Sequence, residues 1–178
     1  MSHIMLDLET LDTRRSAIVL SIGAVRFDPN SSRISSSIYL VPNQNEQRVA
    51  GRTESLATLA WWREQTPQAR EVLTSPSIPV LDALSAFTAW MGQEDVDGVW
   101  GNSAAFDNEI IRSLYESFNL DAPWPFWIDR CFRTVKAIGK TNGVSAPPFL
   151  GVPHNAVDDA FNQVTHLQRI VEYAGVRI

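Results

Sequence analysis

The chain has 178 residues, of which 44% are hydrophobic and 20% charged, a balance that excludes disorder and predicts one folded domain over residues 1–178. The net charge of −5 argues against a simple basic nucleic-acid-binding module, although charge alone does not decide this. The sequence has no apolar stretch long enough to span a membrane, no signal-peptide pattern and a single cysteine, Cys131, so we expect a cytoplasmic protein.

The first part of the chain predicts strands. Residues 4–8 form a short apolar run, residues 17–27 are rich in β-branched side chains, and residues 34–40 alternate between apolar and polar. A turn-forming cluster at residues 28–32 separates the second run from the third. Because the connections are short, we expect three strands in an antiparallel meander.

The rest of the chain predicts helices and one further strand. Thr58 is a candidate N-cap for a short helix that reaches Glu64, and Pro67 starts a further turn. Helices are then expected at residues 79–92, 108–118, 128–139 and about 155–174, and a strand at 96–100. This order indicates an α/β fold of two or three layers built on a mixed sheet.

Acidic residues stand within apolar sequence at two places. Asp7 and Glu9 are two positions apart on the first strand, so both side chains emerge on one face while Leu8 faces the other. The alternative is a pair of exposed acids on an edge strand. Asp107 follows an apolar strand and a loop of small residues, and its alternative role is to cap the helix from Asn108. Converging carboxylates repel one another unless they share protons or divalent cations, so we expect a metal site.

A histidine and two acids mark the start of the last helix. His154 lies on the preceding loop and can accept a proton near neutral pH. Asp159 is a candidate metal ligand, although Asp158 and Asp159 both also suit the positive end of a helix. We interpret Asp158 as such a charge, and we expect His3 and His166 to be ordinary surface histidines.

Taken in order, these motifs resemble the DEDDh branch of the DnaQ-like 3′→5′ exonucleases, within the RNase H-like superfamily. The resemblance rests on Asp7-Leu8-Glu9-Thr10, on Phe106-Asp107, and on His154 followed five residues later by Asp159. It implies an α/β RNase H-like fold, in which a mixed β-sheet is flanked by α-helices.

Two further segments resemble a subgroup related to exonuclease VIII and a phage-encoded exonuclease A. These are residues 58–65 and 100–108, and the subgroup contains both DNA- and RNA-degrading members. The family often has asparagine four residues before the second-motif aspartate, where this chain has Ser103, with Asn102 one step earlier. The resemblance places Asn102 and Phe106 among the expected substrate contacts.

The resemblance also implies a mechanism that uses two divalent cations, Mg²⁺ or Mn²⁺, about 4 Å apart. Asp7, Glu9 and Asp159 would bind the cation that holds the attacking water. Asp7 would bridge to the second cation, and Asp107 would support it. His154 would be the general base, and a nucleoside 5′-monophosphate would leave from a 3′ end.

Contacts with the terminal nucleotide are expected directly after the first motif. The backbone at Thr10 and Leu11 would meet this nucleotide, with the Leu11 side chain wedged against its base. Trp62 or Trp61 would stack on a base. Because neighbours on a helix point about 100° apart, only one of the two tryptophans faces the substrate.

The expected partner is the 3′ end of single-stranded DNA or RNA. We expect a free-standing enzyme, and the resemblance allows a homodimer. Two other functions remain open. One is a nucleic-acid-binding module that is catalytically weak. The other is a metal-dependent nucleotide phosphohydrolase, which would release phosphate or pyrophosphate instead of nucleoside monophosphates.

Overall fold

The computed structural model describes every residue from 1 to 178. Its strands are β1 (His3–Thr10), β2 (Val19–Phe27), β3 (Ile34–Leu40), β4 (Gly98–Gly101) and β5 (Asp129–Cys131). Its helices are α1 (Gln44–Val49), α2 (Leu56–Arg63), α3 (Pro67–Arg70), α4 (Val80–Met91), α5 (Asp107–Ser117), α6 (Phe132–Thr141) and α7 (Ala156–Ala174). Short 3₁₀ turns occur at Glu71–Leu73 and Phe126–Ile128.

The strands form one five-stranded mixed sheet in the order β3-β2-β1-β4-β5. β1, β2 and β3 pair antiparallel, which confirms the predicted meander. β4 pairs parallel to β1, and β5 pairs parallel to β4. The sheet is therefore mixed, as the sequence predicts, with β1 at its centre.

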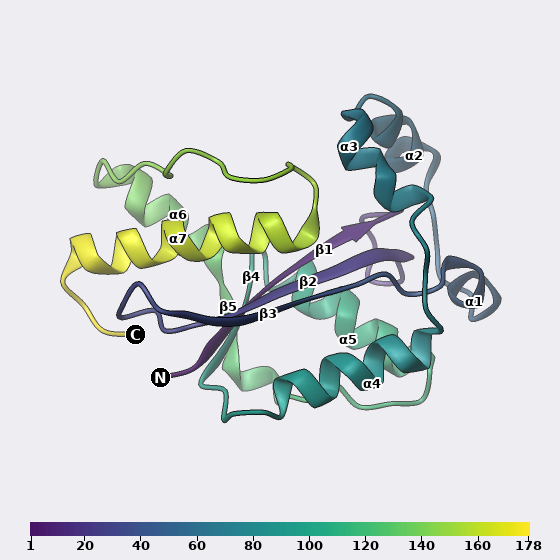
Figure 1. Cartoon of the computed structure of the whole chain (residues 1–178), viewed down its shortest axis with the longest axis horizontal. Helices are drawn as coiled ribbons and strands as arrows, with labels where there is room; N and C mark the ends of the chain where they lie inside the picture. The colour runs from purple at the N-terminus through teal and green to yellow at the C-terminus, as the bar shows by residue number, and fades with distance from the viewer.

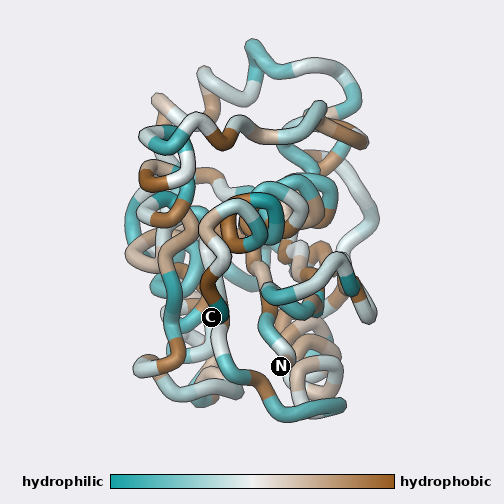
Figure 2. The backbone as a smooth tube through the Cα atoms, turned by 90° about the vertical axis from the view of Figure 1, so that its left-hand side faces the viewer, coloured by the Kyte–Doolittle hydropathy of each residue, from teal (hydrophilic) through white to brown (hydrophobic).

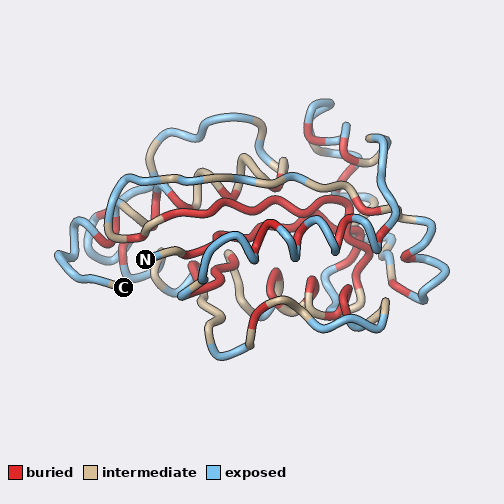
Figure 3. Tube along the Cα trace, turned by 60° about the horizontal axis from the view of Figure 1, so that its bottom comes forward, coloured by how far each residue is buried: buried red, intermediate tan, exposed pale blue.

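Helices cover both faces of the sheet, with α6 and α7 on one side and α4 and α5 on the other (Figure 1). One apolar cluster joins Leu6 and Leu8 of β1 to α4 and α5. A second cluster joins Met5 of β1 to α6 and α7. The central strands are thus buried on both faces, as the continuous red segments of Figure 3 show. The result is a three-layer α/β fold with a mixed sheet between helices.

The helices present apolar residues to the sheet and polar residues to solvent. Figure 2 shows brown and teal segments alternating along the helical turns, the pattern of helices with one apolar face. A third, smaller cluster lies between the end of β1 and α2, and it includes Leu11, Ile18, Leu20 and Trp62. This cluster fixes α2 beyond the tip of β1 (Figure 1).

Two local predictions were wrong, and one helix was missed. Residues 129–131 form strand β5 rather than the first turn of a helix, because they pair with Val99, Trp100 and Gly101 of β4. Three residues are too few to show a strand periodicity. Helix α2 begins three residues earlier than predicted, because the Ser55 hydroxyl caps it by accepting from the Thr58 N–H at 3.1 Å. Helix α1, capped by Asn43, was not predicted at all.

A glycine on β2 determines how closely α7 approaches the sheet. A Cβ atom at Gly23 would lie 2.2 Å from the backbone carbon of Ala156 and from the nitrogen of Val157. Only glycine therefore allows the first turn of α7 to rest directly on the strand. None of the helices combines the length and the apolar character that crossing a membrane requires.

Candidate active site

Asp7 and Glu9 lie on the same face of β1, as the sequence predicts. Leu8 between them points into the cluster with α4 and α5, so the two acids point to the side of α7. Both carboxylates are buried, with only 8% and 7% of each residue exposed. The alternative of an exposed pair on an edge strand was wrong, because β1 is the central strand.

Asp107 is the first residue of α5 and follows β4 after a loop of five residues. Its carboxylate accepts the Ser103 N–H at 3.1 Å, and the N-cap position belongs to Phe106. A Cβ at Gly101 would come within 2.8 Å of the Asp107 side chain and 2.5 Å of Asn108 Oδ1. The small residue at the end of β4 thus makes the space in which the Asp107 carboxylate is buried.

The start of α7 carries His154 and Asp159. Asn155 caps the helix by accepting the N–H groups of Val157 and Asp158. The Asp159 carboxylate accepts the His154 N–H at 2.8 Å, and His154 has a φ of 66°, in the left-handed region. This backbone turn places the imidazole beside the acid of its own helix.

The structure brings three of the predicted residues to within coordination reach. Ligand atoms of Glu9, His154 and Asp159 all lie within 4.8 Å of one another. Asp7 and Asp107 belong to the same cluster, since the charges of Asp107, Glu9 and Asp159 all raise the pKa of Asp7. Residues that are up to 152 positions apart in the chain therefore form one acidic cluster.

Burial raises the pKa of every carboxyl group in this cluster, and repulsion from other members adds to the effect at Asp7 and Glu9. Burial is the largest cause, and it raises the pKa of Glu9 to about 8, with Asp159 and Asp107 adding repulsion. It raises the pKa of Asp107 to about 6, against the opposing effect of the Ser103 N–H. Burial and then the charge of Asp107 raise the pKa of Asp7 well above its ordinary value, and burial raises that of Asp159.

This donor set fits divalent cations. The cluster consists of carboxylate oxygens, which Mg²⁺ and Mn²⁺ prefer, and it holds more negative charge than a buried site tolerates without compensation. The imidazole of His154 offers the only nitrogen ligand among these carboxylate oxygens. No cysteine takes part, which disfavours a structural zinc site.

Asp7 has a partner that the sequence predictions did not include. Gln163 of α7 donates its side-chain N–H to Asp7 Oδ1 at 2.7 Å. Gln163 lies four residues after Asp159, so both side chains point from the same face of the helix. Helical periodicity alone could have identified Gln163, because any side chain four positions from a ligand on a helix projects beside it.

The two tryptophans of α2 point in different directions. Trp62 is 1% exposed, and its indole N–H donates to the Thr10 carbonyl at 2.9 Å. Trp62 therefore belongs to the core, and its expected stacking on a base was wrong for this side chain. Trp61 is 40% exposed and lies edge-on to the His154 ring, with 4.8 Å between ring centroids. Of the two, Trp61 is the exposed one and the one in closer contact with His154.

The other expected substrate contacts lie next to the site but differ in exposure. Leu11 is only 1% exposed, so its side chain is covered here by the cluster around Trp62. Thr10 is buried, and its hydroxyl donates to the Asp12 carbonyl at 2.7 Å. Asn102 and Phe106 are half-buried on the loop before Asp107, so they remain predicted contacts.

The remaining histidines are not surface residues, contrary to expectation. His3 is buried beside Trp100, whose indole N–H it accepts at 2.8 Å, and His166 is buried against Phe132. Burial lowers the pKa of both. Asp158 accepts the Val152 N–H at 2.8 Å, a structural contact at the helix start that agrees with its interpretation as a helix-start charge.

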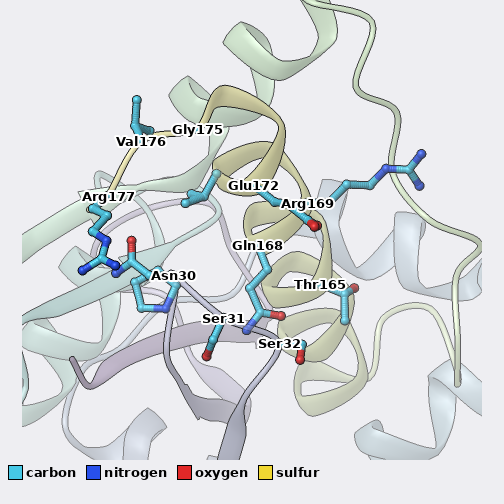
Figure 4. Close-up of a pocket in the computed structure, with 12 residues that line it drawn as sticks. Asn30, Ser31, Ser32, Thr165, Gln168, Arg169, Glu172, Gly175, Val176 and Arg177 are labelled. Carbon is cyan, nitrogen blue, oxygen red and sulfur yellow. The ribbon is translucent and has the colours of Figure 1, made fainter.

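One cavity of the molecule lies away from the acidic cluster. It measures about 760 Å³ and is lined by the β2–β3 hairpin and the C-terminal part of α7, including Asn30, Gln168 and Arg177 (Figure 4). It contains none of the acidic cluster. The chemistry is therefore concentrated at the start of α7 and not in this cavity.

The fold agrees with comparisons to known proteins. The chain is 21% identical to an exodeoxyribonuclease of Enterobacteria phage T4, over 98% of this chain and 91% of that protein. The nuclease domain of 3′hExo, a DEDDh family member bound to rAMP, has a TM-score of 0.65 at 13% identity, with coverage of 97% and 92%.

Two larger nucleases share the fold. Cell-death related nuclease 4 has a TM-score of 0.63 at 20% identity, and the chain covers 64% of it. The exonuclease I–DNA complex of E. coli has a TM-score of 0.71 at 13% identity, and the chain covers 41% of it. In both cases about 97–98% of this chain is matched, so it spans only part of each of these nucleases. At these identities the likeness concerns the fold.

A match to a family model shows to which family the chain belongs. The model of the 3′-5′ exoribonuclease Rv2179c-like domain matches residues 2–171, which include every residue of the acidic cluster. The chain therefore belongs to the family of Rv2179c-like 3′-5′ exoribonuclease domains.

Proposed function

We propose that this 3′-5′ exonuclease domain removes nucleotides one at a time from the 3′ end of single-stranded nucleic acid and releases nucleoside 5′-monophosphates. One observation carries the proposal: buried carboxylates from β1, α5 and α7 converge beside His154. The description of the matching family favours RNA as the polymer. The phage relative is named an exodeoxyribonuclease, so DNA is the comparison substrate.

Each residue of the cluster has a role in the proposal. Asp7, Glu9 and Asp159 would hold one Mg²⁺ or Mn²⁺ ion, and Asp7 and Asp107 would hold a second. When bound, these ions supply positive charge that stabilises the charge developing during phosphodiester cleavage. Their charge would also relieve the repulsion that raises the carboxyl pKa values.

His154 would be the general base. A ring nitrogen of His154 lies within 4.8 Å of ligand atoms of Glu9 and Asp159. The Trp61 ring packs edge-on against the imidazole and limits how far the imidazole can rotate. An imidazole at this position can take a proton from the attacking water through a ring nitrogen that carries no hydrogen.

A cleavage assay tests the proposal. The wild type, Asp7→Ala and His154→Ala are incubated with 5′-labelled single-stranded RNA and DNA, in Mg²⁺, in Mn²⁺ and in chelator. We expect the wild type to produce a ladder of products shortened from the 3′ end, only with metal, and both variants to produce none. Equal products from the variants, or cleavage in chelator, would reject the proposal.

A further inference from the structure

The longest stretch of the chain without an acidic residue carries several positive charges. Residues 130–157 contain four basic and no acidic residues, whereas the rest of the chain contains 11 basic and 20 acidic residues. Both lysines of the chain, Lys136 and Lys140, fall in this segment. The segment begins on β5, includes α6 and ends at the start of α7, next to His154.

Helix α6 carries three of these four basic side chains on one side. Arg133, Lys136 and Lys140 are spaced by three and four residues, so their side chains project from neighbouring positions of the helix surface. None of the three takes part in an ion pair, since the four ion pairs of the protein use Arg15, Arg48 and Arg112. These cations are therefore available to an external anion.

The first turn of α6 is attached to the active-site loop. The Arg133 N–H donates to the Asn102 carbonyl at 2.9 Å, and Lys136 Nζ lies 3.5 Å from Asn102 Oδ1. Asn102 lies on the loop between β4 and Asp107. The Lys136 ammonium also lies 5.6 Å from the centre of the Phe132 ring, which holds its stem along the helix. The basic side of α6 thus begins at the edge of the acidic cluster.

We propose that Arg133 and Lys136, extended by Lys140, form a binding track for the phosphodiester backbone of a single strand whose 3′ end occupies the acidic cluster. This inference rests on the proposed function and adds the place where the polymer is held. The acidic cluster by itself repels a polyanion, and the chain outside residues 130–157 is strongly acidic. Binding of a longer strand then depends on cations outside the cluster.

The track makes a prediction that depends on substrate length. A dinucleotide fits the acidic cluster alone, whereas an oligoribonucleotide of about 20 nucleotides also reaches the track. In Arg133→Ala/Lys136→Ala the ratio of kcat/KM for the long substrate to that for the dinucleotide should fall about tenfold. The salt dependence of binding should weaken, with the slope of log K against log salt falling by about 1.4 for two lost phosphate contacts.

The matched control is Arg169→Ala/Arg177→Ala, which removes two positive charges beside the cavity at the other end of α7 (Figure 4). The control should keep the wild-type ratio and the wild-type slope. Arg133→Lys/Lys136→Arg should restore both, because charge is conserved. Far-UV circular dichroism checks that all variants are folded.

Binding of a fluorescent oligoribonucleotide in chelator tests the track separately from catalysis. Weaker binding by Arg133→Ala/Lys136→Ala alone supports the track, even if the wild type cleaves neither polymer and the proposed function fails. An unchanged length ratio, an unchanged salt slope or an equal loss in the control would overturn the track while leaving a metal-dependent exonuclease intact.

Discussion

In the metal-free protein, a neutral side chain at position 7 would stabilise the fold better than the charged carboxylate of Asp7. It is buried, and its neighbours Glu9, Asp107 and Asp159 all raise its pKa. A single hydrogen bond from Gln163 opposes this effect. Functional sites often hold such a conflict, because the arrangement that binds a cation is unfavourable without it.

The variant Asp7→Asn should therefore separate stability from activity. Asparagine keeps an oxygen that can accept from Gln163 but removes the buried charge. We expect the melting temperature of the metal-free protein at pH 8 to rise, while exonuclease activity in Mg²⁺ falls by about 100-fold or more. A lower melting temperature in chelator would mean that the charge of Asp7 stabilises the fold.

The raised pKa of Glu9 predicts how the stability of the folded protein depends on pH. This pKa is raised from an ordinary value of 4.5 to about 8, so the folded protein binds the proton more tightly than the unfolded chain. This contribution to stability is fully present below about pH 4.5 and is lost as the pH rises to about 8. In chelator, the melting temperature should fall between pH 5 and pH 8.

Glu9→Gln is the control for this titration, because it removes one of the titrating groups and should make the fall in melting temperature over the same range shallower. Addition of Mn²⁺ to the wild type should also make this fall shallower, since a bound cation replaces the proton. A melting temperature that rises steadily from pH 5 to pH 8 in chelator would contradict the assignment to Glu9.

The order of the acids in the sequence was enough to predict the cluster, since Glu9, His154 and Asp159 come together as expected. Alternation on a strand correctly placed Asp7 and Glu9 on one face. The predictions for individual contacts were weaker. The burial of His3 could not be predicted, because it depends on strand β4 bringing Trp100 beside it.

At the scale of elements, α2 divides its two tryptophans between the core and the active site. Trp62 fills the cluster beyond β1 and donates to the backbone of the first motif. Trp61 lies against His154. The spacing of neighbours on a helix predicts that the two differ, but which one is buried depends on how α2 packs on β1.

Alanine at each position should give opposite phenotypes. Trp62→Ala should destabilise the protein by about 3–5 kcal/mol, because it removes a buried indole and its hydrogen bond. Trp61→Ala should cost less than about 1 kcal/mol in stability but lower kcat, because His154 loses its neighbour. Urea unfolding and steady-state kinetics measure the two effects. Equal losses of stability would contradict this division.

The contact between β2 and α7 positions half of the site. Gly23 lets the first turn of α7 rest on the strand, and this turn carries Asp159. Gly23→Ala should push the start of α7 outward, costing about 1–3 kcal/mol and lowering activity together. Gly143→Ala is a useful comparison, because nothing lies within 4 Å of its added Cβ, although its φ of 78° adds backbone strain. Wild-type activity in Gly23→Ala would show that α7 can shift without harm.

Strand β5 is an element that the sequence pattern did not predict. Its three residues carry no alternating pattern, and only pairing with β4 makes them a strand. The apolar runs of β1 and β2 predicted strands correctly because both faces of the sheet are covered. Sequence patterns therefore identified the longer strands, including the edge strand β3, better than the three-residue strand β5.

Across the whole molecule, charge is distributed in agreement with the proposed reaction. The acids that would hold metal lie at the end of β1 and at the starts of α5 and α7, and the basic segment that includes α6 adjoins them. A chain with a net charge of −5 can then still bind a polyanion at one place. Net charge alone could not predict this, because the separation of the two signs is visible only along the chain and in the fold.

The most direct test of the account is the identity of the first product. An oligoribonucleotide labelled in its 3′-terminal nucleotide is incubated with wild type or Asp7→Asn, in Mg²⁺ or chelator, and the released label is identified by mass spectrometry. The account predicts a labelled nucleoside 5′-monophosphate from wild type in Mg²⁺ and no release in the other three reactions. Release in chelator or by Asp7→Asn, or release as a longer fragment or a 3′-phosphate, would contradict it.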